Sequence, residues 1–196
     1  AFDDVRADGL RGMLDGEVPE GLVVDPDLRW HLLTALATTG HAGSPEITDE
    51  LSRDDTGSGR TAARRARAGL PDEGVRAAAW HAAWTDESLS NDHLDAEIAG
   101  FRAGGRRDLI EGFDEEYFDR ILHAWRTRSI ELARRLVAGL FPAMPTLQRV
   151  DAWLEQHDDA PAALRRIVIE QRDHLARDIR VRAAQSQPAS SSATVL

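Results

Sequence analysis

Helix start and stop signals recur along this chain at short intervals, and they constrain its fold more than any other feature. In the segment "DPDLRWHLLTALATTG", Asp25 stands at the N-cap, Pro26 takes the first helical position and Gly40 follows the last turn. Ser44 and Pro45 repeat the same opening a few residues later. No segment alternates apolar and polar residues for long enough to predict a strand. These patterns predict an all-α fold.

The remaining helices are predicted from the same signals. One helix is expected over about Arg60 to Gly69, and further helices are expected to start at Asp72, Ser90 and Asp114. Three more are expected over 127–142, within "TLQRVDAWLEQHDD" and, as a long last helix, over about 160–184. Roughly eight to ten short helices joined by brief loops favour an α-solenoid of stacked antiparallel helix pairs, in the HEAT or armadillo manner. The spacing between units varies, so the repeat is geometric rather than a repeat of sequence.

The chain is expected to hold one domain and a tail. Residues 1–184 are interpreted as a single helical-repeat domain, because the helix signals run through them without a linker. Residues 185–196, "QSQPASSSATVL", are polar and small, and we expect them to be disordered.

Several classes of protein are excluded by composition. The chain has no cysteine, which excludes disulfides and thiolate metal sites. It has no stretch approaching the ~20 apolar residues of a membrane span, and its first residues do not form a signal peptide. We therefore expect a cytoplasmic protein with no membrane partner. The chain lacks an initiator methionine, which favours a processed chain or an excerpt of a longer one.

The charge is acidic overall and uneven along the chain. The formal net charge is −10, and all 24 basic residues are arginines. Residues 1–55 carry 13 acidic and 4 basic residues, a balance of −9. Such a region repels nucleic acid and anionic membranes. This argues against a helical transcriptional repressor, which would need a basic helix-turn-helix near its N-terminus.

No catalytic or metal-binding constellation is found. None of the seven histidines forms a His-x-His or H-E-x-x-H pattern, so no zinc ligands or catalytic residues are predicted in this chain. Glu170, Asp173 and His174 are interpreted as a solvated helix face. The five tryptophans lie beside helical apolar stripes and are interpreted as core residues.

Five segments, in order, carry a resemblance to a known family. They are "LRWHLLTALATTG", "DDTGSGRTAARRARAGLPDEGVRAAAW", "SNDHLDAEIAGF", "YFDRILHAWRTRSIELARRLVAGLFP" and "ALRRIVIEQRDHLARDIRVRA". Together they resemble the C-terminal helical domain of the aminopeptidase N family of zinc metallopeptidases, and actinobacterial members most of all. The similarity covers roughly residues 10–184.

The resemblance implies a function for the region without implying a catalytic residue in it. In that family, zinc is held by H-E-x-x-H and a downstream glutamate in preceding domains, and this chain has neither that motif nor a cofactor of its own. The implied role is a bowl of stacked helices that closes over the catalytic domain of the same polypeptide. Through that parent enzyme, which releases N-terminal amino acids, the domain would control the access of peptide substrates.

The candidate site residues lie at the start of the arginine-rich segment 127–142 and directly before it. Glu131 and Arg135 are expected to pair at i,i+4, and a buried stripe is expected at Ile130, Ala133, Val137 and Leu140. Arg126 and Arg128 precede this helix. In a concave solenoid they are candidates for facing the substrate cavity and binding a peptide carboxylate.

A free-standing helical scaffold that binds a protein partner remains the alternative. An upstream, in-frame H-E-x-x-H in the same gene would favour the aminopeptidase, and its absence would favour the scaffold.

Overall fold

The computed structural model describes residues 4–185 and confirms the all-α prediction, with ten α-helices, three short 3-10 helices and no strand in that range. Within it, no helix is both long and apolar enough to cross a bilayer. The predicted disordered tail lies outside the described residues, apart from Gln185, which ends the last helix. The α-helices are α1 (Asp4–Leu14), α2 (Pro26–Thr38), α3 (Ser44–Arg53), α4 (Gly57–Ala68), α5 (Glu73–Thr85), α6 (Asn91–Phe101), α7 (Asp114–Thr127), α8 (Ile130–Gly139), α9 (Gln148–Gln156) and α10 (Ala162–Gln185).

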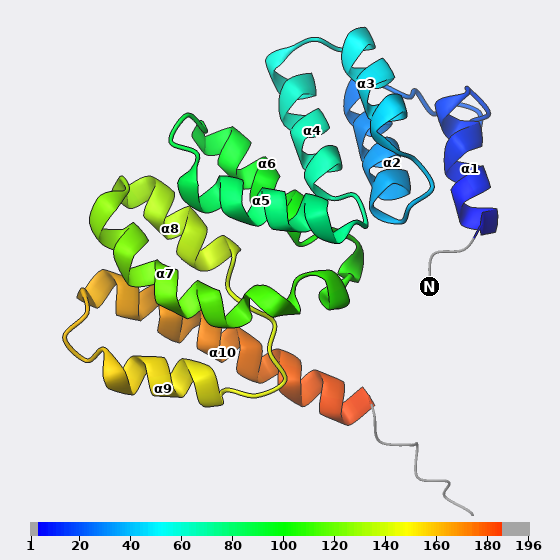
Figure 1. Ribbon diagram of the computed structural model, residues 1–196. Helices are drawn as coiled ribbons and strands as arrows, with labels where there is room; N and C mark the ends of the chain where they lie inside the picture. The colour runs from blue at the N-terminus through cyan, green and yellow to red at the C-terminus, as the bar shows by residue number, and fades with distance from the viewer. Residues whose placement is uncertain (1–3, 186–196) are drawn as a thin grey trace, which may run out of the picture.

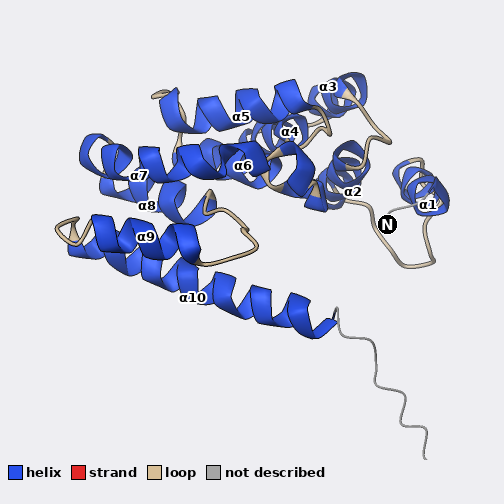
Figure 2. Ribbon diagram, turned by 60° about the horizontal axis from the view of Figure 1, so that its bottom comes forward, coloured by secondary structure: helices blue, strands red, loops and turns tan. Residues whose placement is uncertain are grey.

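The helices form two rows. The even-numbered helices contact one another in chain order, α2 with α4, α4 with α6, α6 with α8 and α8 with α10. We call these five helices the even row. The odd-numbered helices α3, α5, α7 and α9 each pack on the even helix that follows them (Figures 1 and 2). This order of contacts is the one expected when helix pairs stack in sequence, while the bowl shape stays a prediction.

Three predicted helix starts are confirmed by side-chain caps. Asp25 accepts a hydrogen bond from the Leu28 amide at 2.8 Å, Asp72 caps α5 in the same way, and Ser90 caps α6. Each cap satisfies one of the amides that a helix leaves without a partner at its first turn.

Two predicted starts are displaced. The N-cap of α3 is Gly43 rather than Ser44, and the Glu46 carboxylate accepts a hydrogen bond from the Gly43 amide. Helix α4 starts at Gly57 rather than near Arg60, because the Thr56 hydroxyl caps its first turn. The cap decides this start even though the first turn contains two glycines.

The prediction of one helix over 127–142 is wrong. Thr127 ends α7, and Ser129 caps α8 by accepting a hydrogen bond from the Leu132 amide. Ile130 is 57% exposed because it lies in the first turn of α8, beyond the packed part of that helix. The buried positions on this segment are Ala133, Leu136, Val137, Leu140, Phe141 and Pro142.

Two regions have helical structure that the sequence patterns did not reveal. Helix α1 packs on α2 although no start signal announces it. The segment after α6 forms three 3-10 turns over 103–113, with Gly104 at a φ of 76°. Glycine adopts this left-handed conformation readily.

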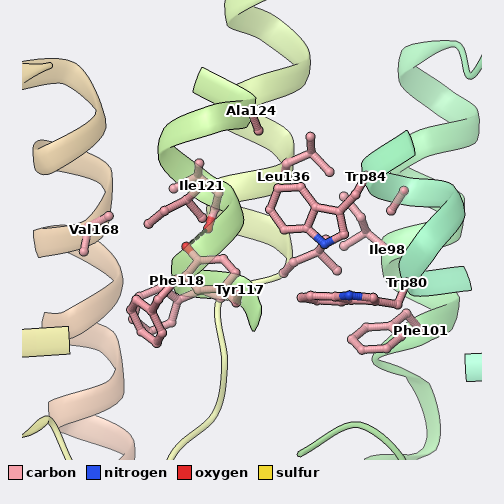
Figure 3. Close-up of a cluster of buried hydrophobic side chains, with 14 of the residues drawn as sticks. Trp80, Trp84, Ile98, Phe101, Tyr117, Phe118, Ile121, Ala124, Leu136 and Val168 are labelled. Atoms are coloured by element: carbon pink, nitrogen blue, oxygen red, sulfur yellow. Dashed lines mark hydrogen bonds between the residues drawn. The ribbon is translucent and has the colours of Figure 1, made fainter. Parts of the chain in front are cut away.

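The buried apolar side chains form two clusters. One joins α1 to α4 and includes Trp30, and the other runs from the end of α4 to α10 (Figure 3). In the second cluster, Trp80 lies within 5.5 Å of the ring centroids of both Trp84 and Phe101. Four tryptophans are buried, and Trp125 is partly buried against the same core, so the packing interpretation is confirmed.

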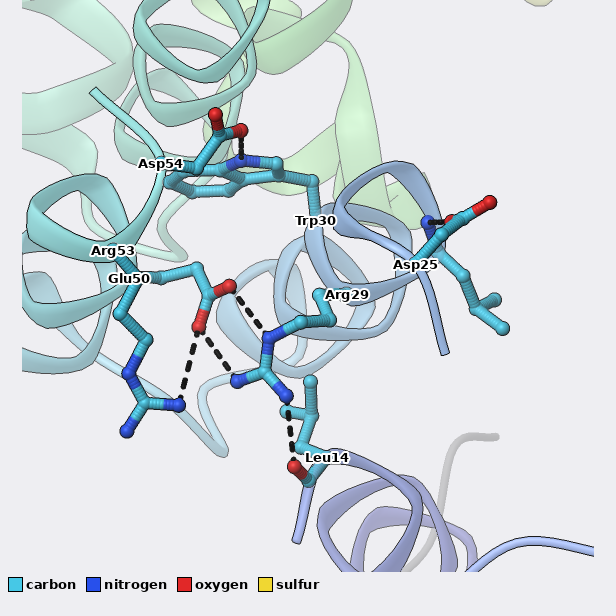
Figure 4. A network of polar contacts seen from close by, with 8 residues as sticks. Leu14, Asp25, Arg29, Trp30, Glu50, Arg53 and Asp54 are labelled. Carbon is cyan, nitrogen blue, oxygen red and sulfur yellow. Dashed lines mark hydrogen bonds and ion pairs between the residues drawn. The ribbon is translucent and has the colours of Figure 1, made fainter. Parts of the chain in front are cut away.

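A polar network holds α1, α2 and α3 together (Figure 4). Arg29 donates two hydrogen bonds to the buried Glu50 carboxylate, at 2.6 and 2.7 Å, and a third to the Leu14 carbonyl. The bidentate contact with Glu50 raises the pKa of Arg29. Because guanidinium and carboxylate meet as matching forks, the network fixes the orientation of these helices as well as their proximity.

Candidate functional site

A wide groove crosses three helices of the even row. Its volume is 1260 Å³, and α2, α4, α6 and the turn at 102–104 line it. Its walls combine small side chains with hydroxyl, carboxylate, imidazole and guanidinium groups. The lining residues include Asp27, Thr34, Thr61, Arg65, Asp92, Ala99 and Arg102.

Helices α2, α4 and α6 run in the same direction, and their C-terminal ends meet at one end of the groove. A Cβ atom on Gly69 would lie 2.8 Å from the Thr38 side chain, and one on Gly104 would lie 2.8 Å from the Thr38 carbonyl oxygen. A Cβ on Gly100 would lie 2.5 Å from the Arg65 carbonyl oxygen. The ends of α2, α4 and α6 therefore approach one another at distances that only glycine permits.

The two ends of the groove therefore carry side chains of opposite charge. Asp27 and Asp92 lie in the first turns of α2 and α6. Arg102 lies just after α6 and donates a hydrogen bond to the Gly139 carbonyl. Carboxylates thus gather near the helix N-termini and a guanidinium near the C-termini, where each sign complements the helix dipole.

Arg76 connects the C-terminal ends of α4 and α6 at one end of the groove. Its guanidinium is fully buried and donates to the carbonyls of Gly69, at 2.6 Å, and Gly100, at 2.7 Å. It also donates to the carbonyls of three other residues, namely Leu70, Phe101 and Ala103. Burial lowers the pKa of Arg76. Carbonyl oxygens at the ends of α4 and α6 surround the charge, and no ion pair with a carboxylate is found for it in residues 4–185.

At the other end of the groove, the segment 54–56 connects the N-terminus of α4 to α2. Asp54 accepts a hydrogen bond from the Trp30 indole at 2.8 Å and another from the Thr56 hydroxyl at 2.7 Å. The bond from Thr56 is the main cause that lowers the pKa of Asp54, and the bond from Trp30 adds to it. Since Thr56 also caps α4, one short motif ties the N-terminus of α4 to α2.

The predicted site residues Arg126 and Arg128 do not line this groove. Arg126 is exposed in the last turn of α7. Arg128 is partly buried, and its Nη2 donates to the Trp84 carbonyl at 2.7 Å, near the end of α5. The predicted pair of Glu131 and Arg135 is present at 2.9 Å, and Arg135 also pairs with Asp95 at the groove edge.

Metal binding has no support in the described residues. No group of three histidine, aspartate, glutamate or cysteine side chains stands close enough to hold an ion there. Glu170, Asp173 and His174 are exposed on α10, as a solvated face should be.

Comparison with known proteins gives two matches. A family model described as the ERAP1-like C-terminal domain matches residues 3–177. The chain is also 40% identical over 189 residues to "Aminopeptidase N" of Streptomyces lividans, an alignment that covers 94% of this chain and 22% of that protein. The resemblance inferred from the five segments is therefore confirmed: the chain belongs to the ERAP1-like C-terminal domain family, the helical C-terminal domain of the aminopeptidase N family.

Proposed function

We propose that this domain works within a zinc aminopeptidase, where it covers the active-site cavity and controls which peptides enter. The family assignment supports a domain of a peptidase that acts together with a catalytic part. The chain spans about a fifth of its relative's length, 22%. In this proposal the catalytic domain and its zinc belong to the same polypeptide, outside the residues of this chain.

The observation that carries the proposal is the groove. Neighbouring helices pack about 8–10 Å apart, so a groove across three of them spans roughly 20 Å. That length matches about six residues of an extended peptide at about 3.3 Å each. Small and hydroxyl side chains such as Ala99, Thr34 and Thr61 leave room for varied side chains. A wall of this kind suits a domain that must admit peptides of many sequences.

Arg126 and Arg128 remain proposed contacts for the far end of a bound peptide. Arg126 is exposed, and Arg128 spends one donor on the Trp84 carbonyl and keeps others for a ligand. Guanidinium groups outside the groove would meet a carboxylate only in peptides long enough to pass beyond it. The contribution of each is expected to be small, because exposed ion pairs typically stabilise by about 0.2–1 kcal/mol.

The test uses a chimera in which this chain replaces the matching segment of the Streptomyces lividans enzyme. We expect Arg126→Ala and Arg128→Ala each to raise KM for peptides of about ten residues by roughly two- to fivefold, in keeping with that range. KM for single amino-acid anilides should stay unchanged, because these never reach the far wall. Steady-state kinetics on both substrates measures the effect.

A thermal melt of each variant shows whether Arg126 or Arg128 also contributes to the stability of the domain. Arg128→Ala should also lower the stability of the domain, since it removes a hydrogen bond to α5 worth about 1 kcal/mol. Arg126→Ala should not. Equal changes for peptides and anilides, or no change for either, would remove both residues from the proposed peptide contact.

A further inference from the structure

A second pocket lies on a different face of α4. Its volume is 380 Å³, and α3, α4 and α6 line it. We call it the basic pocket, and its lining residues are Leu51, Arg60, Arg64, Arg67, Ala68, His93 and Glu97. Apart from His93, which stands between the two, it shares no lining residue with the groove.

Three arginines bring their charges together in this pocket. Arg60, Arg64 and Arg67 follow one another at i, i+4 and i+7 on α4, so they share one face of the helix. Three guanidinium groups on one face repel one another unless anions stand among them. In a chain with a net charge of −10, this concentration of positive charge is local and specific.

The side chains of the pocket supply one carboxylate to these three charges. Arg64 donates to Glu97 at 2.9 Å, and Glu97 is 7% exposed. Burial is the main cause that raises the pKa of Glu97. Glu97 is therefore a buried acid whose carboxylate pairs with Arg64.

The other two arginines leave donors available. Arg60 lines the pocket, and its Nη1 donates to the carbonyl and the carboxylate of Asp55, at 2.9 and 2.5 Å. Arg67 donates one bond to the neutral Thr48 hydroxyl at 3.2 Å, and within residues 4–185 it has no carboxylate partner. Each guanidinium has five N–H donors, so most of the donors of Arg67 are not used by the protein.

We propose that the basic pocket binds a small multivalent oxyanion of the phosphate type. Its tetrahedral oxygens can accept bonds from two or more guanidinium forks at once, which a monovalent carboxylate does less well. An anion held between Arg60, Arg64 and Arg67 would relieve their mutual repulsion.

Isothermal titration calorimetry of the 196-residue chain with sodium pyrophosphate tests the proposal, with sodium chloride used to keep the ionic strength constant. Expected is a saturable, one-to-one titration, with inorganic sulfate weaker and acetate without a saturable signal. Arg67→Gln should weaken pyrophosphate binding at least about tenfold, because one charge-assisted contact is lost. Arg134→Gln, which changes an exposed arginine on α8, should alter the dissociation constant less than about twofold.

Circular dichroism checks that each variant is folded. If Arg67→Gln is not, Arg60→Gln takes its place, since Arg60 is 53% exposed. The proposal is overturned if pyrophosphate shows no saturation below about 10 mM, an affinity too weak for a built site. It is equally overturned if the arginine variants of the pocket and of α8 weaken binding by the same factor, which would indicate a response to overall charge.

Discussion

Replacing Arg76 with methionine is expected to lower the free energy of unfolding by about 3 kcal/mol or more. Methionine fills much of the volume but donates no hydrogen bond. The carbonyls of Gly69, Gly100 and Phe101 would then lose their buried bonds to the guanidinium. An unsatisfied buried polar group costs about 1–3 kcal/mol.

Urea unfolding followed by circular dichroism measures this effect, and Arg134→Met is the matched control. Arg134 is exposed on α8, so its replacement should change stability by less than about 0.5 kcal/mol. Since Arg76 joins the C-terminal ends of α4 and α6, amides at 100–104 should also exchange faster with solvent in Arg76→Met. Equal stability losses in the two variants would show that the buried guanidinium is not a special support of the fold.

Replacing Gly59 with alanine is the second large effect that we expect. A Cβ there would lie 2.0 Å from the Asp54 carbonyl oxygen and 2.7 Å from its Oδ2. The clash involves backbone, so relief requires α4 to move away from the segment that carries Asp54 and its bond to Trp30. Overpacking of this kind typically costs about 1–3 kcal/mol, and the Trp30 contact would be lost in addition. Thermal unfolding would report the first effect, and the NMR signal of the Trp30 indole N–H would report the second.

Gly57→Ala in the same helical turn is the control. No atom lies within 4 Å of a Cβ at Gly57, so alanine should stabilise the helix by up to about 1 kcal/mol. Opposite signs for the two substitutions are therefore expected. If Gly59→Ala were as stable as Gly57→Ala, the close approach between Asp54 and α4 would be wrong.

Local signals explain why the helical nature of the fold and several helix starts could be predicted. Asp25, Asp72 and Ser90 cap helices through bonds to amides three residues ahead, and such contacts depend on nothing beyond the segment itself. The two glycines of "TGSG" resemble a loop, so the sequence pattern predicts the start of α4 too late. The Thr56 cap in the same segment marks the true start.

The division between α7 and α8 shows where local signals become ambiguous. The segment "WRTRSIELARR" continues a helical pattern without glycine or proline. Ser129 is compatible both with a helix interior and with an N-cap, and only the packing of α7 on α8 decides between them. Because of this break, Ile130 falls in an exposed first turn instead of the predicted buried stripe.

The candidate site could be predicted least of all. The groove exists because α2, α4 and α6 come together, and no pattern within one segment specifies that contact. Arg76 did leave a trace, since it shares a helix face with Ala79, Trp80 and Ala83, all of which are buried. An arginine on an apolar stripe predicts a buried, multiply bonded guanidinium, but its carbonyl partners come from two other helices.

The most direct test of the proposed function fills the groove and measures peptide cleavage in the chimera with the Streptomyces lividans enzyme. Thr61 lines the groove on α4 and is partly exposed, whereas Ala78 is exposed on α5 outside it. We expect Thr61→Trp to lower kcat/KM for a peptide of about ten residues by roughly tenfold and to leave an amino-acid anilide unchanged, because bulk in a peptide path is typically worth about 1–3 kcal/mol. Ala78→Trp should affect neither substrate. If Thr61→Trp leaves both substrates unaffected, or slows both by the same factor, then the groove is not part of the peptide's path.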